Sequence, residues 1–177
     1  TYSAMGLIYD KRQVQAAPTS ISALWNPRWR GKVIAYNAGT HNFSLAALAM
    51  GLPDPFHIPA ERTEAVADHL IKLRRNALAF YTQPDESVHL FLRHNAAILF
   101  ANYGMQQVHL LRNAGVEVGY VIPREDALAW LACWAIPRNA RNPTLAHAWI
   151  NHLLGNTASR LLVTRQGLAS TVSSSAQ

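Results

Sequence analysis

Eight histidines are the side chains of this 177-residue sequence that first suggest metal chemistry. His89 and His94 are five residues apart, and so are His147 and His152. Two ligands on one face of a helix need a spacing of three or four residues, and no cysteine or carboxylate completes either pair at ligand spacing. We therefore expect no metal site and no cofactor.

Catalytic chemistry finds equally little support. A hydrolytic triad could be assembled from Ser44, His41 and a distant aspartate, but nothing in the sequence fixes its geometry. The phosphate-binding loop, the dinucleotide fingerprint, the zinc-protease motif and the serine nucleophile elbow are all absent. We therefore expect no catalytic residues and a protein that is not an enzyme.

Two polar loops follow predicted strands and offer a binding site instead. Asn37–Asn42 follows Val33–Tyr36, and Asn102–Gly104 follows Ala96–Ala101; each loop opens a helix. Ligands of open α/β sheets bind outside the carboxyl ends of strands, where helix N-termini present free N–H groups. The expected ligand-binding side chains are Asn37, Thr40, His41, Asn42, Asn102 and Tyr103. Thr40 and Asn42 should also cap the helix that begins at Phe43.

The stretch Gly115–Pro137 joins two parts of the chain. It holds the apolar runs Val116–Ile122 and Leu128–Ile136, separated by a polar loop. Trp130 lies in the second run and on its own would be read as a core residue, although aromatic faces also line ligand clefts. Cys133, the only cysteine, is expected to be a small buried residue.

Short strands alternate with helices before this stretch, which predicts an α/β sandwich. The remaining strands are expected at Tyr2–Tyr9 and Leu78–Thr82, and the helices at Ser20–Leu24, Phe43–Met50, Glu61–Arg75, Glu86–Arg93, Met105–Asn113, Pro143–Leu154 and Thr157–Arg165. Leu168–Gln177 is expected to be frayed. Because the first residues already read as the interior of a strand, we expect the chain to be part of a longer protein.

Composition restricts the partners. Half of the residues are hydrophobic and 15% are charged, as in globular proteins. The net charge is +6, but the Lys and Arg residues are spread along the chain, which favours a basic surface over a nucleic-acid site. No apolar run approaches the roughly 20 residues that span a membrane.

Three segments, in order, resemble the periplasmic solute-binding proteins of ABC transporters. Pro18–Val33 (PTSISALWNPRWRGKV) resembles their P-x-S-W-x-D-L-W segment, Gly115–Pro137 resembles the segment that ends in W-x-D-x-x-A-I-P, and Pro143–Leu154 resembles the helix after it. The likeness is greatest to the spermidine/putrescine-binding subgroup and covers nearly the whole chain.

The resemblance implies a type 2 periplasmic-binding-protein-like fold, in which two α/β lobes close on a solute. Residues 1–6 would be a hinge strand and residues 7–128 the second lobe. Residues 129–177 would be the return hinge and helices of an incomplete first lobe. Trp130 would then line the interlobe cleft and bind the ligand.

The family's amine-binding acids are missing. The family has an aspartate two residues after the cleft tryptophan, where this chain has Ala132, and acids in the loop matching Asn37–Asn42, where it has Ala38 and His41. Carboxylates are what a cationic amine requires. We expect a periplasmic protein that delivers a small polar solute, anionic or zwitterionic and not a polyamine, to a permease. A homodimer that covers the exposed hinge face is a further expectation.

Two other functions share this fold. One is the effector domain of a bacterial transcription regulator, which an N-terminal helix-turn-helix upstream would indicate. The other is an enzyme, which would need a catalytic acid or metal in the cleft.

Overall fold

A mixed five-stranded sheet forms the centre of the protein, in a computed structural model that describes residues 1–172. The strand order is β4 (Ala77–Tyr81), β3 (Val33–Tyr36), β5 (Ile98–Ala101), β2 (Gly6–Asp10) and β6 (Val118–Val121). Strand β3 runs parallel to both β4 and β5, whereas β2 runs antiparallel to β5 and β6. The α/β prediction is confirmed, and the sheet is mixed.

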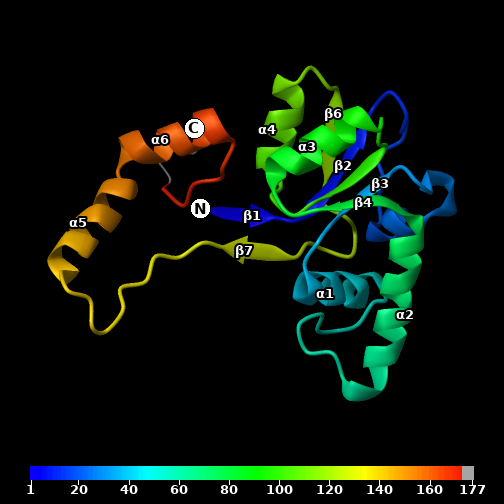
Figure 1. The fold of residues 1–177 in the computed structure, drawn as a ribbon, viewed down its shortest axis with the longest axis horizontal. Helices are drawn as coiled ribbons and strands as arrows, with labels where there is room; N and C mark the ends of the chain where they lie inside the picture. Colours follow the sequence, from blue (N-terminus) through cyan, green and yellow to red (C-terminus); the bar gives the residue numbers. More distant parts are fainter. Residues whose placement is uncertain (173–177) are drawn as a thin grey trace.

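Helices cover both faces of this sheet (Figure 1). Helices α1 (Gly39–Ala49) and α2 (Ala60–Asn76) pack on one face, together with the 3₁₀ turns Ile21–Trp25 and Pro27–Trp29. Helices α3 (Pro84–Arg93) and α4 (Met105–Asn113) pack on the other. Successive side chains of a strand point to opposite faces of the sheet, so the strands contribute to both cores. On β2, Leu7 belongs to the core on one face and Ile8 to the core on the other.

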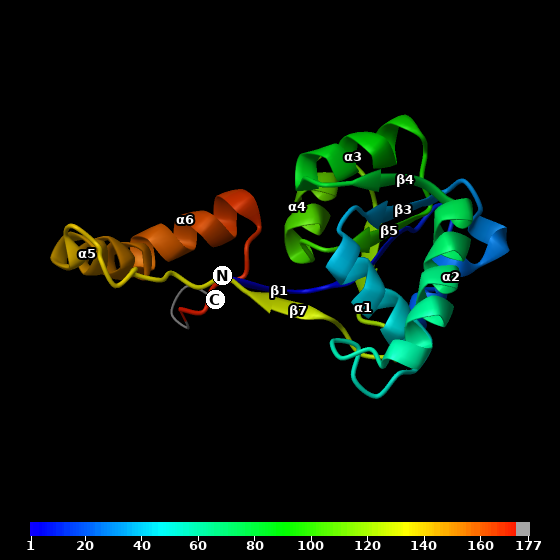
Figure 2. The same ribbon diagram turned by 60° about the horizontal axis from the view of Figure 1, so that its bottom comes forward.

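A two-stranded ribbon links this body to a pair of helices that stand apart from it (Figure 2). Strand β1 (Tyr2–Ala4) pairs antiparallel with β7 (Ala129–Leu131). An extended segment then leads to α5 (Pro143–Leu153) and α6 (Asn156–Gln166). Only the C-terminal end of α6 returns toward α4: a Cβ on Gly167 would lie 2.6 Å from the Cβ of His109.

Two predicted strands are shorter than expected. Tyr2–Tyr9 is two strands in different sheets, because the chain turns at Met5, whose N–H donates to the Leu128 carbonyl at 2.7 Å. Within Leu128–Ile136, only Ala129–Leu131 is a strand, since β1 offers it no longer partner. Composition alone does not show where a partner strand ends.

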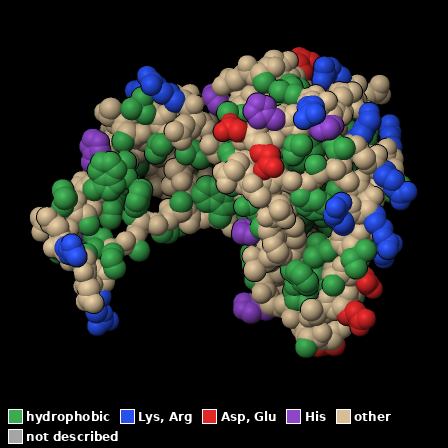
Figure 3. Space-filling model, in the orientation of Figure 1, with side chains coloured by type: hydrophobic (Ala, Val, Ile, Leu, Met, Phe, Trp, Pro, Cys, Tyr) green, Lys and Arg blue, Asp and Glu red, His purple; other side chains and the backbone are tan. Residues whose placement is uncertain are grey.

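Burial was also predicted wrongly beyond β7. Cys133 is exposed and not buried as expected, and the neighbouring apolar region also exposes Trp134 (62%) and Trp149 (54%). In the tail, Ala169 forms a bridge with Tyr2, while the part of the prediction that concerns residues 173–177 lies outside the described residues. The apolar side chains of this region therefore form a surface, which Figure 3 shows in green over the α5 side.

The buried carboxylate of Asp10 ends strand β2. It accepts hydrogen bonds from the Arg12 backbone N–H (2.9 Å), from Arg12 Nε and Nη2 (3.0 and 2.8 Å) and from Gln13 Nε2 (3.2 Å). The Arg12 side chain holds the pKa of this carboxyl below its usual range, although burial acts in the opposite direction. The lowered pKa means that the folded protein favours the ionised form.

Replacing Asp10 with Asn is predicted to lower the free energy of unfolding at pH 7 by about 1–3 kcal/mol, because charged hydrogen bonds are lost in a buried position. The carboxylate stabilises the fold above its unfolded pKa of about 3.9, and this contribution is lost as the pH falls through the lower folded pKa. Urea unfolding at pH 7 and pH 3 should show the difference shrinking. Asp68→Asn, at an exposed position of α2, should change little; equal effects of the two variants would contradict the prediction.

Candidate functional site

The mixed sheet brings several segments to one edge. Strands β3, β4 and β5 end there because they are parallel, and β2 begins there because Gly6 pairs with Ala101. Strand β6 ends at the same edge, where Val121 pairs with Leu7. The polar loops after β3 and β5 therefore meet the segments that join β1 to β2 and β6 to β7.

Helix α1 begins at Gly39, four residues earlier than predicted, so Thr40, His41 and Asn42 lie in its first turn. Ala38 is the N-cap and gives no side-chain hydrogen bond, so the predicted capping by Thr40 and Asn42 is wrong. Asn42 Nδ2 instead donates to the Tyr36 carbonyl at 2.9 Å and ties the helix to the end of β3. The first turn keeps N–H groups that have no partner within the helix.

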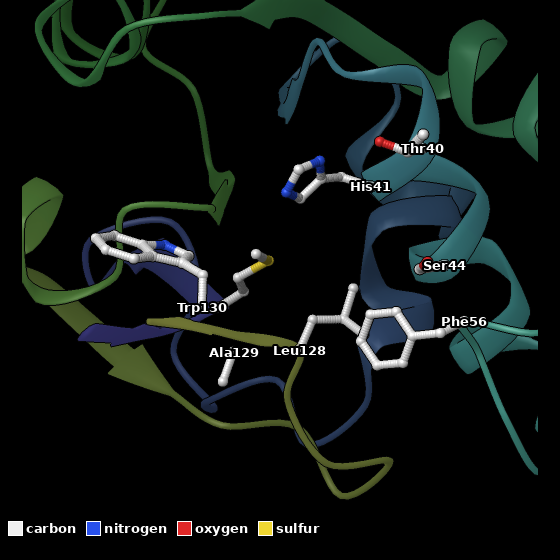
Figure 4. A pocket seen from close by; sticks show the side chains of 8 residues that line it. Thr40, His41, Ser44, Phe56, Leu128, Ala129 and Trp130 are labelled. Carbon is white, nitrogen blue, oxygen red and sulfur yellow. The ribbon is translucent and has the colours of Figure 1, made fainter. Parts of the chain in front are cut away.

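A pocket of about 150 Å³ lies between α1 and the crossing segments (Figure 4). His41 projects toward it from α1, and the Trp130 indole stands on the opposite side. The rest of the lining is mostly apolar or hydroxylic: Met5, Thr40, Ser44, Phe56, Leu128 and Ala129. Among these lining residues there is no Asp, Glu, Lys or Arg, so the pocket offers a solute contact area and hydrogen bonds.

Trp130 is fixed in this wall by one hydrogen bond. Its Nε1–H donates to the Asn102 carbonyl at 3.0 Å, so the loop after β5 holds the indole in place. Trp130 is half-buried and is not a core residue, as the family resemblance implied and the apolar run alone did not. The hydrogen bond joins two segments 28 residues apart in the sequence.

Three buried polar atoms at this edge have no hydrogen-bond partner among the described residues: His41 Nδ1, Asn42 Oδ1 and Asn102 Oδ1. Leaving such a group unsatisfied costs about 1–3 kcal/mol. All three belong to residues predicted to bind ligand. Their presence together means that this edge can still accept hydrogen bonds from a bound molecule.

Aromatic rings pack between the loop after β3 and the loop after β5. The ring of Tyr36 lies edge-on to both His41 and Tyr103, at centroid distances of 5.7 and 5.9 Å. Tyr103 also donates its hydroxyl to the Thr82 carbonyl at 2.9 Å. Burial, with the nearby Tyr36 hydroxyl, raises the pKa of Tyr103 to about 12, so its hydroxyl remains protonated at neutral pH.

The predicted site residues thus gather at one edge, although they differ in depth. Thr40, His41 and Trp130 line the pocket. Asn42 follows His41 in α1, and Asn102 binds the Trp130 indole, whereas Tyr103 contacts Tyr36 and does not line the pocket. Asn37 is exposed, and its backbone N–H donates to the Tyr81 carbonyl at 2.8 Å, which extends the pairing of β3 with β4. The lining residues not predicted from sequence are Met5, Ser44, Phe56, Leu128 and Ala129. No signal in the sequence marked Met5, which lies where the chain crosses between the two sheets, or Phe56, which lies in a proline-rich loop.

The family model of bacterial extracellular solute-binding proteins matches residues 1–177. The chain belongs to this family. Spermidine/putrescine-binding periplasmic protein 1 of Haemophilus influenzae is 29% identical over 144 residues, which is 81% of this chain and 39% of that protein. The chain therefore spans well under half the length of this curated relative.

Solved structures show the same fold for this solute-binding protein. The spermidine/putrescine ABC transporter substrate-binding protein of Streptococcus pneumoniae matches with a TM-score of 0.74 and 22% identity, over 96% of this chain and 51% of that one. The Atu4243 GABA receptor matches with a TM-score of 0.79 and 18% identity, over 99% and 53%. The predicted periplasmic-binding-protein-like fold is confirmed.

The predicted class of protein is confirmed as well, because solute-binding proteins are not enzymes. The relatives' names also agree with the expected periplasmic location. Within residues 1–172, no helix has the length and apolarity needed to cross a membrane, and no three His, Cys, Asp or Glu side chains are grouped as a metal site would require.

The loop that leads to β7 is anchored in the solute-binding protein by Glu125. Its carboxylate accepts hydrogen bonds from the Ser20 hydroxyl and from the Ile21 N–H (3.0 Å), at the start of the first 3₁₀ turn. Burial raises the pKa of Glu125, but these hydrogen bonds outweigh it and hold the pKa below its usual value. The approach to Trp130 is thereby fixed to the body.

Gly104 lets the loop after β5 approach strand β1 closely. Its backbone has φ 54° and ψ −125°, a conformation almost restricted to glycine. A Cβ here would meet the Ser3 hydroxyl and would lie 2.7 Å from the Ala4 carbonyl oxygen. Both the backbone and the space therefore require glycine at this position.

Gly104→Ala is predicted to destabilise the protein by at least about 2 kcal/mol, because backbone strain adds to a clash with β1. Gly115→Ala is the matched control, since Gly115 also has positive φ (79°) but nothing within 4 Å of the added Cβ. The control should lose about 1 kcal/mol. Urea unfolding of both variants measures the difference; equal losses would show that the contact with β1 is unimportant.

Proposed function

We propose that the protein is the solute-binding component of an ABC importer. It captures a small polar solute at the pocket between α1 and Trp130 and delivers it to a permease. Family membership supports this proposal most directly, and the pocket supports it through its position at the strand ends. The effector-domain alternative has no support from the matched relatives, which are transport proteins by name.

The chemistry of the pocket favours a zwitterionic or anionic solute over a polyamine. A polyamine brings two or more ammonium groups and no negative charge of its own, and the lining residues include no carboxylate to pair with them. The first turn of α1 presents N–H groups and the positive end of the helix dipole, which suit a carboxylate. The unpaired oxygens of Asn42 and Asn102 suit N–H or O–H donors of the same solute. A molecule carrying both kinds of group, such as an amino acid, fits this set.

The division of the chain is also part of the proposal. Residues 1–6 act as a hinge strand, residues 7–128 as one lobe of the trap, and residues 129–177 as the return hinge with helices of the other lobe. Support comes from the β1–β7 ribbon, which links the body to α5 and α6. The second lobe would close over Trp130 and complete the pocket.

An apolar groove of about 670 Å³ lies on the α5–α6 side, lined by residues that include Leu131, Trp134, Ile150 and Leu154. Leu131, Trp134 and Leu154 are exposed large apolar side chains, and exposed apolar surface that is grouped in this way can mark a protein–protein contact. We propose that the 177-residue chain on its own covers it by pairing with a second copy. Other polypeptide of the complete protein would cover it in the intact transporter component.

Calorimetry and thermal shift with putrescine, spermidine, amino acids, organic acids and phosphate test the solute class. An amino acid or organic acid is expected to bind, and Trp130→Ala should weaken that binding about thirtyfold or more by removing the aromatic wall. Trp134→Ala, which removes an exposed tryptophan away from the pocket, should leave the affinity unchanged. Tight binding of putrescine or spermidine would overturn the proposed solute class.

Light scattering after size-exclusion chromatography tests the pairing. The chain should run as a dimer at micromolar concentration, and Trp134→Asp should convert it to a monomer by placing a charge in the apolar groove. Ile71→Asp on α2 is the control, because Ile71 is similarly apolar and exposed (48%) but lies on the body. A monomeric parent chain, or equal effects of the two variants, would disprove the pairing.

A further inference from the structure

Three hydrogen bonds run in series from the core of the body to the pocket wall. The Tyr81 hydroxyl, which is fully buried, donates to the Phe100 carbonyl at 2.8 Å and accepts the Asn102 N–H at 2.9 Å. The carbonyl of Asn102 in turn accepts the Trp130 Nε1–H at 3.0 Å. One residue, Asn102, therefore connects a core tyrosine to the indole that lines the pocket.

The need for this hydroxyl follows from the sheet. Strand β3 pairs with β5 only at Ile98 and Leu99, so the last part of β5 has no β3 residue opposite it. Tyr81 lies on β4, on the far side of β3, and its side chain reaches the end of β5. It supplies there the donor and acceptor that a neighbouring strand would otherwise supply.

A buried amide holds the tyrosine and the loop together. Gln107, which is fully buried on α4, places its Oε1 3.0 Å from the Tyr103 N–H and 3.3 Å from the Tyr81 hydroxyl. Its Nε2 donates to the Ser87 hydroxyl at 2.6 Å. Burial raises the pKa of Tyr81, so the hydroxyl remains a donor at neutral pH. The loop after β5 is therefore fixed by buried side chains of β4 and α4, in addition to its own Gly104.

We propose that Tyr81 is a positioning residue for the solute pocket, because its hydroxyl fixes Asn102 and, through Asn102, the Trp130 indole. The same restraint limits where the Asn102 side chain can lie; the residue is 5% exposed, and its Oδ1 has no partner among the described residues. Tyr81 thus fixes the positions of the Trp130 indole and of the Asn102 Oδ1 acceptor without itself contacting the solute. The proposal rests on the proposed function for its purpose, although its geometry does not depend on any solute.

Hydrogen exchange of the tryptophan indole N–H groups tests this series without a ligand. In protein labelled with ¹⁵N-tryptophan, the Trp130 signal is assigned by its loss in Trp130→Phe. Tyr81→Phe should speed exchange at Trp130 Nε1–H about tenfold, because the carbonyl that accepts it is no longer held. Trp25 is an internal reference, since its Nε1–H also donates to a backbone carbonyl, that of His69 at 2.8 Å.

The reference separates positioning from simple loss of stability. If Tyr81→Phe merely destabilised the fold, exchange at Trp25 and Trp130 would rise together. Tyr120→Phe is the matched variant, because it removes another hydroxyl that donates to a backbone carbonyl, that of Ala4 at 2.7 Å; it should leave the ratio of the two rates within about twofold. An unchanged ratio in Tyr81→Phe, or an equal change in Tyr120→Phe, would overturn the proposal. Neither result depends on whether a solute binds.

Discussion

The direction of strand β2 is the constraint on which the site depends. Were the sheet wholly parallel, β2 would begin at the far edge, away from the loops that follow β3 and β5. Because β2 runs antiparallel to β5, its first residue pairs with the last residue of β5. The entering chain at Met5 and the leaving chain at Leu128 therefore meet at the edge that presents the helix N-terminus, and one backbone hydrogen bond joins them.

This arrangement places residues of very different sequence position in one pocket. Residues close to the N-terminus, in the first turn of α1 and in β7 all line it, although no sequence window contains them together. The contacts between them are mostly made to backbone atoms: Trp130 to the Asn102 carbonyl, Asn42 to the Tyr36 carbonyl and Met5 to Leu128. A hydrogen bond to a backbone carbonyl does not depend on the side chain of the residue that accepts it. The pocket wall can therefore keep its position when lining side chains are substituted.

The sequence could predict features that depend on neighbouring residues, but not features that depend on segments distant in the sequence. Strand β3 and helix α4 have the predicted bounds, because their apolar patterns end at polar or glycine signals. The polar loops were found from the rule that ligands of open α/β sheets bind outside the carboxyl ends of the strands. Met5 and Phe56 could not be found, since one depends on a strand pairing and the other on how a loop folds back. The predicted cap role of Asn42 was wrong, because Ala38 is the N-cap and the Asn42 amide donates to the Tyr36 carbonyl instead.

The three polar atoms without a hydrogen-bond partner among the described residues at this edge bear on the chemistry of the solute. Buried amide oxygens that persist without a partner are costly, so a fold retains them where something else completes them. Carboxylates at the same positions would repel one another when no cation is bound, whereas amides and an imidazole carry no such penalty. Asn42, Asn102 and His41 therefore build an edge that can receive hydrogen bonds without attracting charge. We propose that this edge, together with a lining free of acids, selects for the shape and hydrogen-bond donors of a solute more than for its positive charge.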